Sequence, residues 1–150
     1  MSTLIQTLTE KARNIAVRSP WIYRINAGSC NGCDVECATT ALIPRYDIER
    51  LGCQYCGSPR HADIVLITGP LTARIKDDVM RVFAEIPDPK VTVAVGVCPI
   101  SGGIFRESYA VHAPIDQYLP VDVNVPGCPP RPQAIIEGVA QAIAIWRERI

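Results

Sequence analysis

Cysteine is the residue type through which this sequence indicates chemistry most directly. The chain has 150 residues and seven cysteines. Four of them stand in two Cys-x-x-Cys pairs, Cys30–Cys33 and Cys53–Cys56, while Cys98 and Cys128 each precede a proline. An odd number of thiols cannot pair completely into disulfides, and cysteine pairs of this spacing are typical of metal ligands. Metal ligation is therefore the first hypothesis that the sequence supports.

The expected strands bring four of these cysteines together. Three strands end shortly before a cysteine: Trp21–Ile25 before Cys30 and Cys33, Val91–Val97 before Cys98, and Val121–Val125 before Cys128. In a parallel sheet the carboxyl ends of the strands share one edge, so the four thiols are expected there. The apolar run Ile64–Ile67 is a further buried strand, and Gly69 after it is expected to leave room for a cofactor.

This placement predicts one [4Fe–4S] cluster bound by Cys30, Cys33, Cys98 and Cys128. Such a cluster needs four thiolates, backbone N–H groups that offset its charge, and shielding from water. Glycines near the cysteines let the backbone approach closely, and the prolines after Cys98 and Cys128 resemble the Cys-Pro pair of ferredoxin motifs. The chemistry expected of this chain is one-electron transfer, with no catalytic residues of its own.

Two other interpretations of the cysteines stay open from the residues alone. Cys30–Cys33 and Cys53–Cys56 are separated by nineteen residues, which matches the four-cysteine zinc site of a structural or interaction module. That assignment leaves Cys98 and Cys128 unexplained. A Cys-x-x-Cys pair is also typical of a redox dithiol, although two such pairs at different edges of a sheet fit that role less naturally.

The order of the elements predicts an α/β fold of flavodoxin-like type. Expected strands alternate with expected helices at 34–42, 72–85 and 130–149, and residues 46–51 are expected to form an edge strand. This alternation predicts a mostly parallel sheet in the order 2-1-3-4-5, with helices on both faces.

The chain is expected to divide into two parts. Residues 1–20 are expected to form a lead helix that docks on a partner or on its own domain, because apolar residues recur there at helical spacing. Residues 21–150 are expected to form a single iron–sulfur domain.

Charge and hydropathy narrow the classes of protein further. The formal net charge is zero, so no electrostatic argument favours nucleic acid as a partner. No apolar run approaches the roughly 18–20 residues that span a bilayer. Residues 1–18 lack the apolar core and cleavage site of a signal peptide. These features predict a chain that lies in the cytosol or faces it.

Four motifs resemble those of one protein family. They are Ser29-Cys-Asn-Gly-Cys-Asp-Val-Glu36, Ser58-Pro-Arg-His-Ala-Asp63, Thr68-Gly-Pro70 and Val121-Asp-Val-Asn-Val-Pro-Gly-Cys-Pro-Pro130. The set is similar to the family that joins the 20-kDa subunit of respiratory NADH:quinone oxidoreductase to the small subunits of [NiFe] hydrogenases. The resemblance implies a flavodoxin-like fold and a single [4Fe–4S] cluster beside a large partner subunit.

The first motif indicates the branch of the family. Respiratory subunits carry two adjacent cysteines there, whereas two residues separate Cys30 from Cys33, as in hydrogenase small subunits. The resemblance therefore implies the small subunit of an energy-converting, membrane-bound [NiFe] hydrogenase, peripheral on the cytoplasmic side of the cell membrane. The alternative is a quinone-reducing 20-kDa subunit.

The resemblance also implies partners and a reaction. The implied partners are a [NiFe] large subunit, a ferredoxin-like iron–sulfur subunit and the membrane subunits of the complex. The implied reaction is hydrogen evolution or uptake coupled to ion translocation.

Several residues near the motifs have both a structural and a functional interpretation. Cys37, one helical turn after Cys33, is expected to be a small buried hydrophobe, and the thiols of Cys53–Cys56 are expected to be free. Glu36 either stabilises the start of a helix or carries protons at a subunit interface, and Asp34 is a weaker candidate for the second role.

Overall fold

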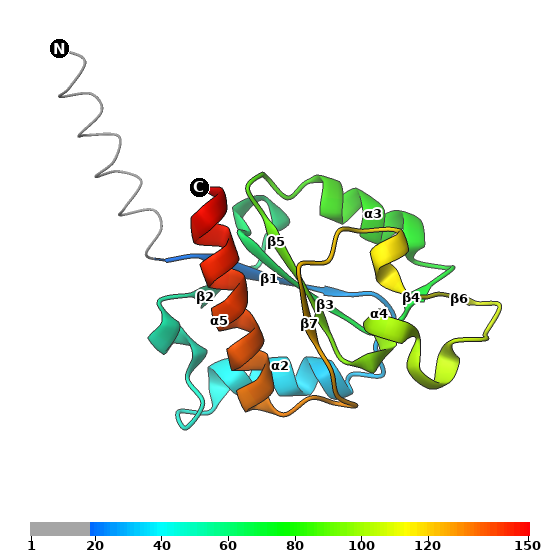
Figure 1. The fold of residues 1–150 in the computed structure, drawn as a ribbon, viewed down its shortest axis with the longest axis horizontal. Coiled ribbons are helices and arrows are strands. Elements are labelled where there is room, and N and C mark those ends of the chain that lie inside the picture. Colours follow the sequence, from blue (N-terminus) through cyan, green and yellow to red (C-terminus); the bar gives the residue numbers. More distant parts are fainter. Residues whose placement is uncertain (1–18) are drawn as a thin grey trace, which may run out of the picture.

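A five-stranded parallel sheet forms the centre of the protein (Figure 1). The structure is a computed structural model that describes residues 19–150, so the lead helix expected in residues 1–18 lies outside the described residues. The strands are β1 (Trp21–Asn26), β2 (Gln54–Tyr55), β3 (Ile64–Thr68), β5 (Val91–Val95) and β7 (Val123–Val125). They lie in the order β2-β1-β3-β5-β7, and every neighbouring pair is parallel. Counted along the chain, this is the order 2-1-3-4-5, so the predicted flavodoxin-like fold is confirmed.

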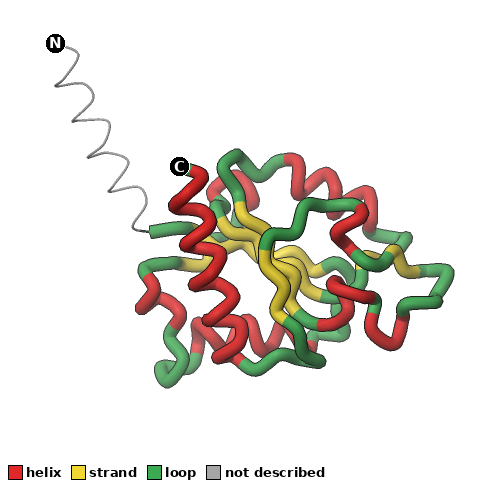
Figure 2. The backbone as a smooth tube through the Cα atoms, in the orientation of Figure 1, coloured by secondary structure: helices red, strands yellow, loops and turns green. Residues whose placement is uncertain are grey.

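Helices cover both faces of the sheet, which is the yellow layer between them in Figure 2. One face packs against α2 (Gly32–Leu42) and α5 (Pro132–Arg149), and the other packs against α3 (Lys76–Ala84). Successive side chains alternate between the faces, so Leu66 packs on the α2/α5 side and Val65 on the α3 side. Because both faces are covered, β3 and β5 are buried along their whole length.

A smaller antiparallel sheet lies beside the main one. It pairs β4 (Leu71–Thr72), which follows β3, with β6 (Val111–His112). The chain reaches β6 from β5 through the short helix α4 (Val97–Ser101) and the 3-10 turn η3 (Gly103–Phe105). Two further 3-10 turns, η2 (Pro59–His61) and η4 (Ile115–Gln117), precede β3 and β7. Within residues 19–150, no helix is both long and apolar enough to cross a membrane.

The prediction of an edge strand at 46–51 is wrong. This stretch contains the 3-10 turn η1 (Ile48–Leu51), which lies between two residues with left-handed backbone, Asp47 (φ 38°) and Gly52 (φ 80°). An extended strand cannot include such residues. Ile48 is fully buried, so this apolar side chain reaches the core from a turn rather than from a strand. The edge strand is β2, which comes directly after.

Two other expected boundaries are also wrong. The helix expected at 72–85 begins only at Lys76, because Thr72 lies in β4 and donates its N–H to the Ala27 carbonyl (3.1 Å) rather than capping a helix. The strand expected at 91–97 ends at Val95. Gly96 turns the chain with φ +97°, and α4 begins at the next residue.

Candidate metal centre

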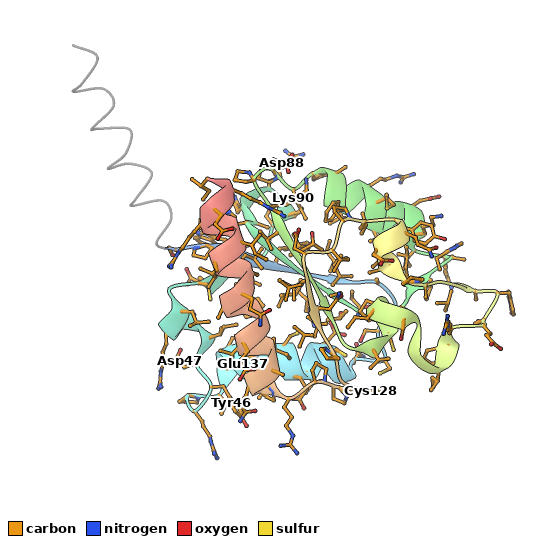
Figure 3. The ribbon with its side chains drawn as sticks, viewed as in Figure 1. Tyr46, Asp47, Asp88, Lys90, Cys128 and Glu137 are labelled. Atoms are coloured by element: carbon orange, nitrogen blue, oxygen red, sulfur yellow. The ribbon has the colours of Figure 1, made fainter. Side chains whose placement is uncertain are left out.

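The four cysteines expected as ligands lie on loops and helix starts at the carboxyl edge of the sheet. Cys30 lies in the loop after β1, and Cys33 in the first turn of α2. Cys98 lies in the first turn of α4 after β5, and Cys128 in the loop after β7. Figure 3 shows Cys128 at the end of the molecule opposite to Asp88, which precedes β5.

Backbone hydrogen bonds join two of these loops directly. The N–H of Gly96 donates to the Val125 carbonyl (2.8 Å), and the N–H of Val97 donates to the Gly127 carbonyl (2.9 Å). These bonds continue the pairing of β5 with β7 beyond the ends of both strands. They therefore fix the segments that carry Cys98 and Cys128 side by side.

The charges of neighbouring cysteines raise the pKa values of two of these thiols, Cys33 and Cys98. The pKa of the Cys33 thiol is raised to about 11, mainly by burial and then by the charges of Cys98, Cys30, Asp34 and Cys128, in that order of size. Burial also raises the pKa of Cys98, with added contributions from Cys128 and Cys30. Neighbouring thiolates are stabilised by a cation, so four thiols at one edge of the sheet are a donor set that fits a centre containing metal.

A [4Fe–4S] cluster requires another arrangement of thiols than a single metal ion does. Among residues 19–150, no three side chains of His, Cys, Asp or Glu lie close enough together to hold one metal ion. In a [4Fe–4S] cluster each cysteine binds a different iron, so its ligands surround a larger body.

Cys53 and Cys56 do not share a site with Cys30 and Cys33. The backbone N–H of Cys56 donates to the Ile22 carbonyl (2.8 Å), which places the pair beside the start of β1, whereas Cys30 follows the end of that strand. Each thiol donates to a carbonyl of its own loop: Cys53 to Ile48 (3.2 Å) and Cys56 to Ser58 (3.3 Å). The four-cysteine zinc arrangement that the spacing allowed is therefore not formed.

Gly96 is a part of the site that the sequence pattern did not reveal. A Cβ atom at this position would lie 2.6 Å from Sγ of Cys33. The absence of a side chain therefore provides the space in which the Cys33 thiol lies. The signal in the sequence was a glycine two residues before Cys98, at the end of a buried strand.

Gly69 does not provide the cofactor space that was expected of it. A Cβ atom there would collide with the backbone of Ser29, and Gly69 has φ +79°. The loop after β1 fills this position, so Gly69 lets the loop that leads to Cys30 cross the end of β3.

Asp34 lies at the centre of a buried polar network next to Cys33. The residue is 5% exposed, and its carboxylate accepts hydrogen bonds from Arg24 Nη1 (2.6 Å), Thr68 Oγ1 (2.9 Å) and Asn26 Nδ2 (3.3 Å). The Asn26 side-chain oxygen in turn accepts from the N–H of Ser29 (2.8 Å). The network thus joins α2, β1, β3 and the loop that carries Cys30.

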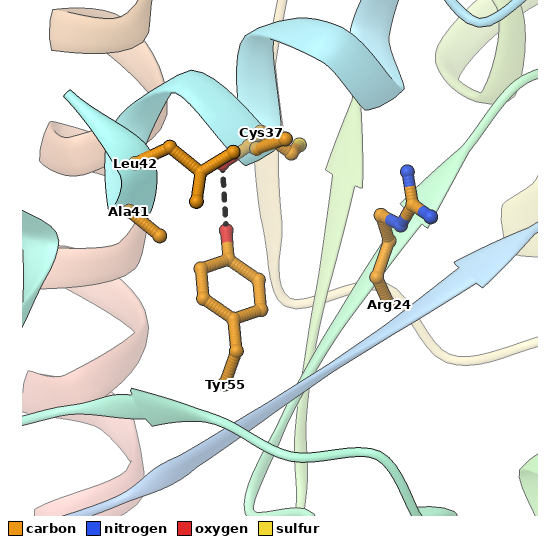
Figure 4. A pocket seen from close by; sticks show the side chains of 6 residues that line it. Arg24, Cys37, Ala41, Leu42 and Tyr55 are labelled. Atoms are coloured by element: carbon orange, nitrogen blue, oxygen red, sulfur yellow. Dashed lines mark hydrogen bonds between the residues drawn. The ribbon is translucent and has the colours of Figure 1, made fainter.

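Cys37 is fully buried in the core, as its hydrophobic interpretation predicts. Burial raises the pKa of its thiol to about 12. The residue borders an apolar pocket between α2, β1 and β2, shown in Figure 4, where Tyr55 donates its hydroxyl hydrogen to the Cys37 carbonyl (3.2 Å).

Glu36 is half-buried on the same helix as Cys37, and no ion pair involving it forms within residues 19–150. Its role in proton transfer stays a prediction.

Apolar side chains are exposed around the cysteines. Val35 on α2 is 61% exposed, and Ile104 on η3, which follows α4, is 92% exposed. Cys30 and Cys128 are themselves exposed. Exposed apolar side chains grouped on one surface are typical of a face that a partner covers.

Fold and site together define a class: an α/β domain with thiols gathered at the carboxyl edge of a flavodoxin-like sheet. The family model described as "NADH ubiquinone oxidoreductase, 20 Kd subunit" matches residues 30–142. The chain belongs to this family and is part of an oxidoreductase, which confirms the resemblance found in its motifs.

Relatives in this family come from hydrogenases and respiratory complexes. The chain is 55% identical over 126 residues to "Probable membrane-bound hydrogenase subunit mbhJ" of Pyrococcus furiosus, covering 84% of this chain and 75% of the relative. It is 44% identical to "Formate hydrogenlyase subunit 7" of Escherichia coli (89% and 52% covered) and 38% identical to a subunit of the NADH-quinone oxidoreductase of Rubrobacter xylanophilus (91% and 53%). The chain spans about half the length of these last two relatives.

Solved structures show the same fold. A chain of the membrane-bound sulfane sulfur reductase, an archaeal respiratory membrane complex, superposes with a TM-score of 0.76 at 34% identity, covering 91% of this chain and 75% of that one. A chain of an NAD+-reducing [NiFe]-hydrogenase gives a TM-score of 0.64 at 21% identity, covering 85% and 92%. The second likeness supports the fold alone.

Proposed function

We propose that this chain holds one [4Fe–4S] cluster through Cys30, Cys33, Cys98 and Cys128 and serves as the electron-transfer small subunit of a membrane-bound [NiFe] hydrogenase complex. The observation that carries the proposal is the meeting of these thiols, from three separate strand ends, at one edge of the sheet. The cluster would supply one-electron transfer. The chain supplies the thiolates, the loops that position them and a partly buried setting.

The hydrogenase branch is favoured over quinone reduction by two observations. Two residues separate Cys30 from Cys33, which resembles hydrogenase small subunits rather than the adjacent cysteines of respiratory subunits. Identity to the hydrogenase relative from Pyrococcus furiosus is 55%, against 38% to the quinone oxidoreductase relative from Rubrobacter xylanophilus.

The resemblance to hydrogenase small subunits and the exposed side of the site support the proposed partners. We assign the face formed by Val35, Ile104 and the exposed cysteines to a [NiFe] large subunit, since a cluster must lie near the site with which it exchanges electrons. A ferredoxin-like iron–sulfur subunit would be the second partner with which the cluster exchanges electrons. Membrane subunits would hold the assembly at the cytoplasmic side of the cell membrane. Glu36, near this face, is the proposed route for protons.

Coexpression with the large subunit tests the proposal. The pair should evolve hydrogen from reduced methyl viologen, and each chain alone should be inactive. Cys30→Ser should abolish activity, while the matched control Cys53→Ser should retain it. If the intact pair reduces a quinone and evolves no hydrogen, the quinone-reductase alternative is correct. If this chain is active alone, its proposed role is wrong.

A further inference from the structure

A buried network of one ion pair and two further hydrogen bonds surrounds Asp34, the residue that follows the proposed ligand Cys33. The Asp34 carboxylate is held by Arg24 from β1 (2.6 Å) and Thr68 from β3 (2.9 Å), with Asn26 as a third donor (3.3 Å). Arg24 is 40% exposed at its side chain and Asp34 only 7%, so the negative partner is the buried one. In Figure 4, Arg24 extends from β1 toward α2 beside the apolar pocket.

The stability of α2 does not explain why this carboxylate is buried. An acidic residue in the first turn interacts favourably with the helix dipole while exposed to water. Burying it requires removal of its hydration shell, a cost that often exceeds the gain from pairing with a cation. An apolar side chain would pack against the sheet here without that cost. Apolar packing alone therefore does not account for a charge at this position.

The neighbour of this charge is the proposed ligand Cys33. The two residues are adjacent in the chain, and the Asp34 charge lies close enough to act on the Cys33 sulfur. The network anchors the first turn of α2 to β1 and β3, so it also fixes where Cys33 lies. The position of Cys33 and the charge near its sulfur therefore both depend on Asp34.

We propose that Asp34 and Arg24 are a positioning pair for the cluster, which fixes Cys33 and sets the reduction potential through the charges of the pair. The inference rests on the proposed function and goes beyond it by assigning residues that control the cluster. Reduction adds one electron to the cluster. A negative charge beside Cys33 opposes that electron and lowers the potential, and the positive charge of Arg24 partly offsets this effect.

The direction in which each variant shifts the midpoint potential distinguishes this proposal from a purely structural role of the pair. In the purified complex, Asp34→Asn removes the negative charge and should raise the midpoint potential of this cluster. Arg24→Gln leaves Asp34 uncompensated and should lower it. Each change should alter the ratio of reduced to oxidised cluster at a fixed potential about tenfold, or about 59 mV for one electron. Arg24→Lys retains the positive charge and should stay close to the unmodified protein.

The chain offers a matched control for the ion pair. Asp122, which precedes β7, pairs with Arg149 (3.2 Å between Nη1 and Oδ2) at the opposite edge of the sheet. Asp122→Asn also breaks an aspartate–arginine pair, but far from the cysteines. The potential of the cluster should not change in this variant.

Redox titration of the complex, followed by electron paramagnetic resonance, decides between the outcomes. Opposite shifts for Asp34→Asn and Arg24→Gln support the proposal; if one variant does not assemble its cluster, the sign of the other decides. Unchanged potentials, shifts of the same sign, or loss of the cluster from both would overturn it, since the pair would then act only on folding or assembly. If the unmodified complex gives no cluster signal from this chain, the proposed function fails first and independently.

Discussion

At the scale of single residues, the site depends on space as much as on thiols. Cys33 lies against the position that a side chain at Gly96 would occupy, and Gly96 has a left-handed backbone that other residues adopt at a cost. A side chain at Gly96 would therefore push the Cys33 sulfur away from the position proposed for it in the cluster site.

We therefore expect Gly96→Ala to impair cluster binding. The added Cβ would lie 2.6 Å from Cys33 Sγ and displace it. Loss of ligand geometry of this kind lowers metal affinity by roughly 10–100-fold. Iron per chain after anaerobic purification measures the effect. Gly57→Ala is the control, because nothing lies within 4 Å of its added Cβ. Equal iron in both variants would contradict the assignment.

Burial of the Cys37 thiol should make the free energy of unfolding depend on pH. Burial raises the pKa of Cys37 from its ordinary 9.0 to about 12. The folded state therefore binds this proton more tightly than the unfolded state, and the resulting stability is complete below about pH 9 and lost as the pH rises toward 12.

In the metal-free chain, the free energy of unfolding should accordingly fall above about pH 9. Cys37→Ala should remove up to about 1.4 kcal/mol per pH unit of that slope. Urea unfolding at a series of pH values measures it. An unchanged slope in the variant would mean that the Cys37 thiol is not the buried acid that the structure shows.

At the scale of elements, long apolar runs could be predicted and short pieces could not. The runs in β3 and β5 are buried on both faces, so their composition alone indicated strands. β2 has two residues, too few to show a period. The prediction of a strand at 46–51 is wrong, because an apolar residue such as Ile48 predicts that its side chain is buried but does not predict the conformation of its backbone.

The candidate site was predictable to a similar degree. The position of the four thiols at one edge of the sheet could be predicted because the segments that carry them follow three parallel strands, and parallel strands end at one edge. The Asp34 network was not found, because its partners Arg24 and Thr68 lie 10 and 34 residues away in sequence. Contacts that depend on the register of three elements leave no local pattern.

The packing of α5 against the sheet should contribute strongly to stability. Ile135 is fully buried between this helix and the strands. Ile135→Ala should lower the free energy of unfolding by about 2–5 kcal/mol, because it leaves a cavity in a closely packed core. Gln141→Ala, exposed on the same helix, should change it by less than about 0.5 kcal/mol. Urea unfolding compares the two, and similar losses would mean that α5 does not pack as the structure shows.

At the scale of the whole molecule, one face carries the exposed cysteines and apolar side chains. Ile104 is 92% exposed, so Ile104→Asp should not disturb folding. We expect it to weaken binding to the large subunit at least about tenfold, or about 1.4 kcal/mol. Ala144→Asp, exposed on α5, is the control that should bind normally. Copurification from coexpressing cells measures both, and unaltered binding of Ile104→Asp would place the interface elsewhere.

The central claim, a [4Fe–4S] cluster on four particular thiols, is tested most directly by acid-labile sulfide and iron in the anaerobically purified pair of this chain and its large subunit. Labile sulfide distinguishes the cluster from both zinc and a nickel–iron site. We predict the sulfide of one cubane cluster per pair, lost in Cys98→Ser and Cys128→Ser and retained in Cys53→Ser and Cys56→Ser. Stoichiometric zinc without sulfide, or equal loss of sulfide in all four variants, would contradict it.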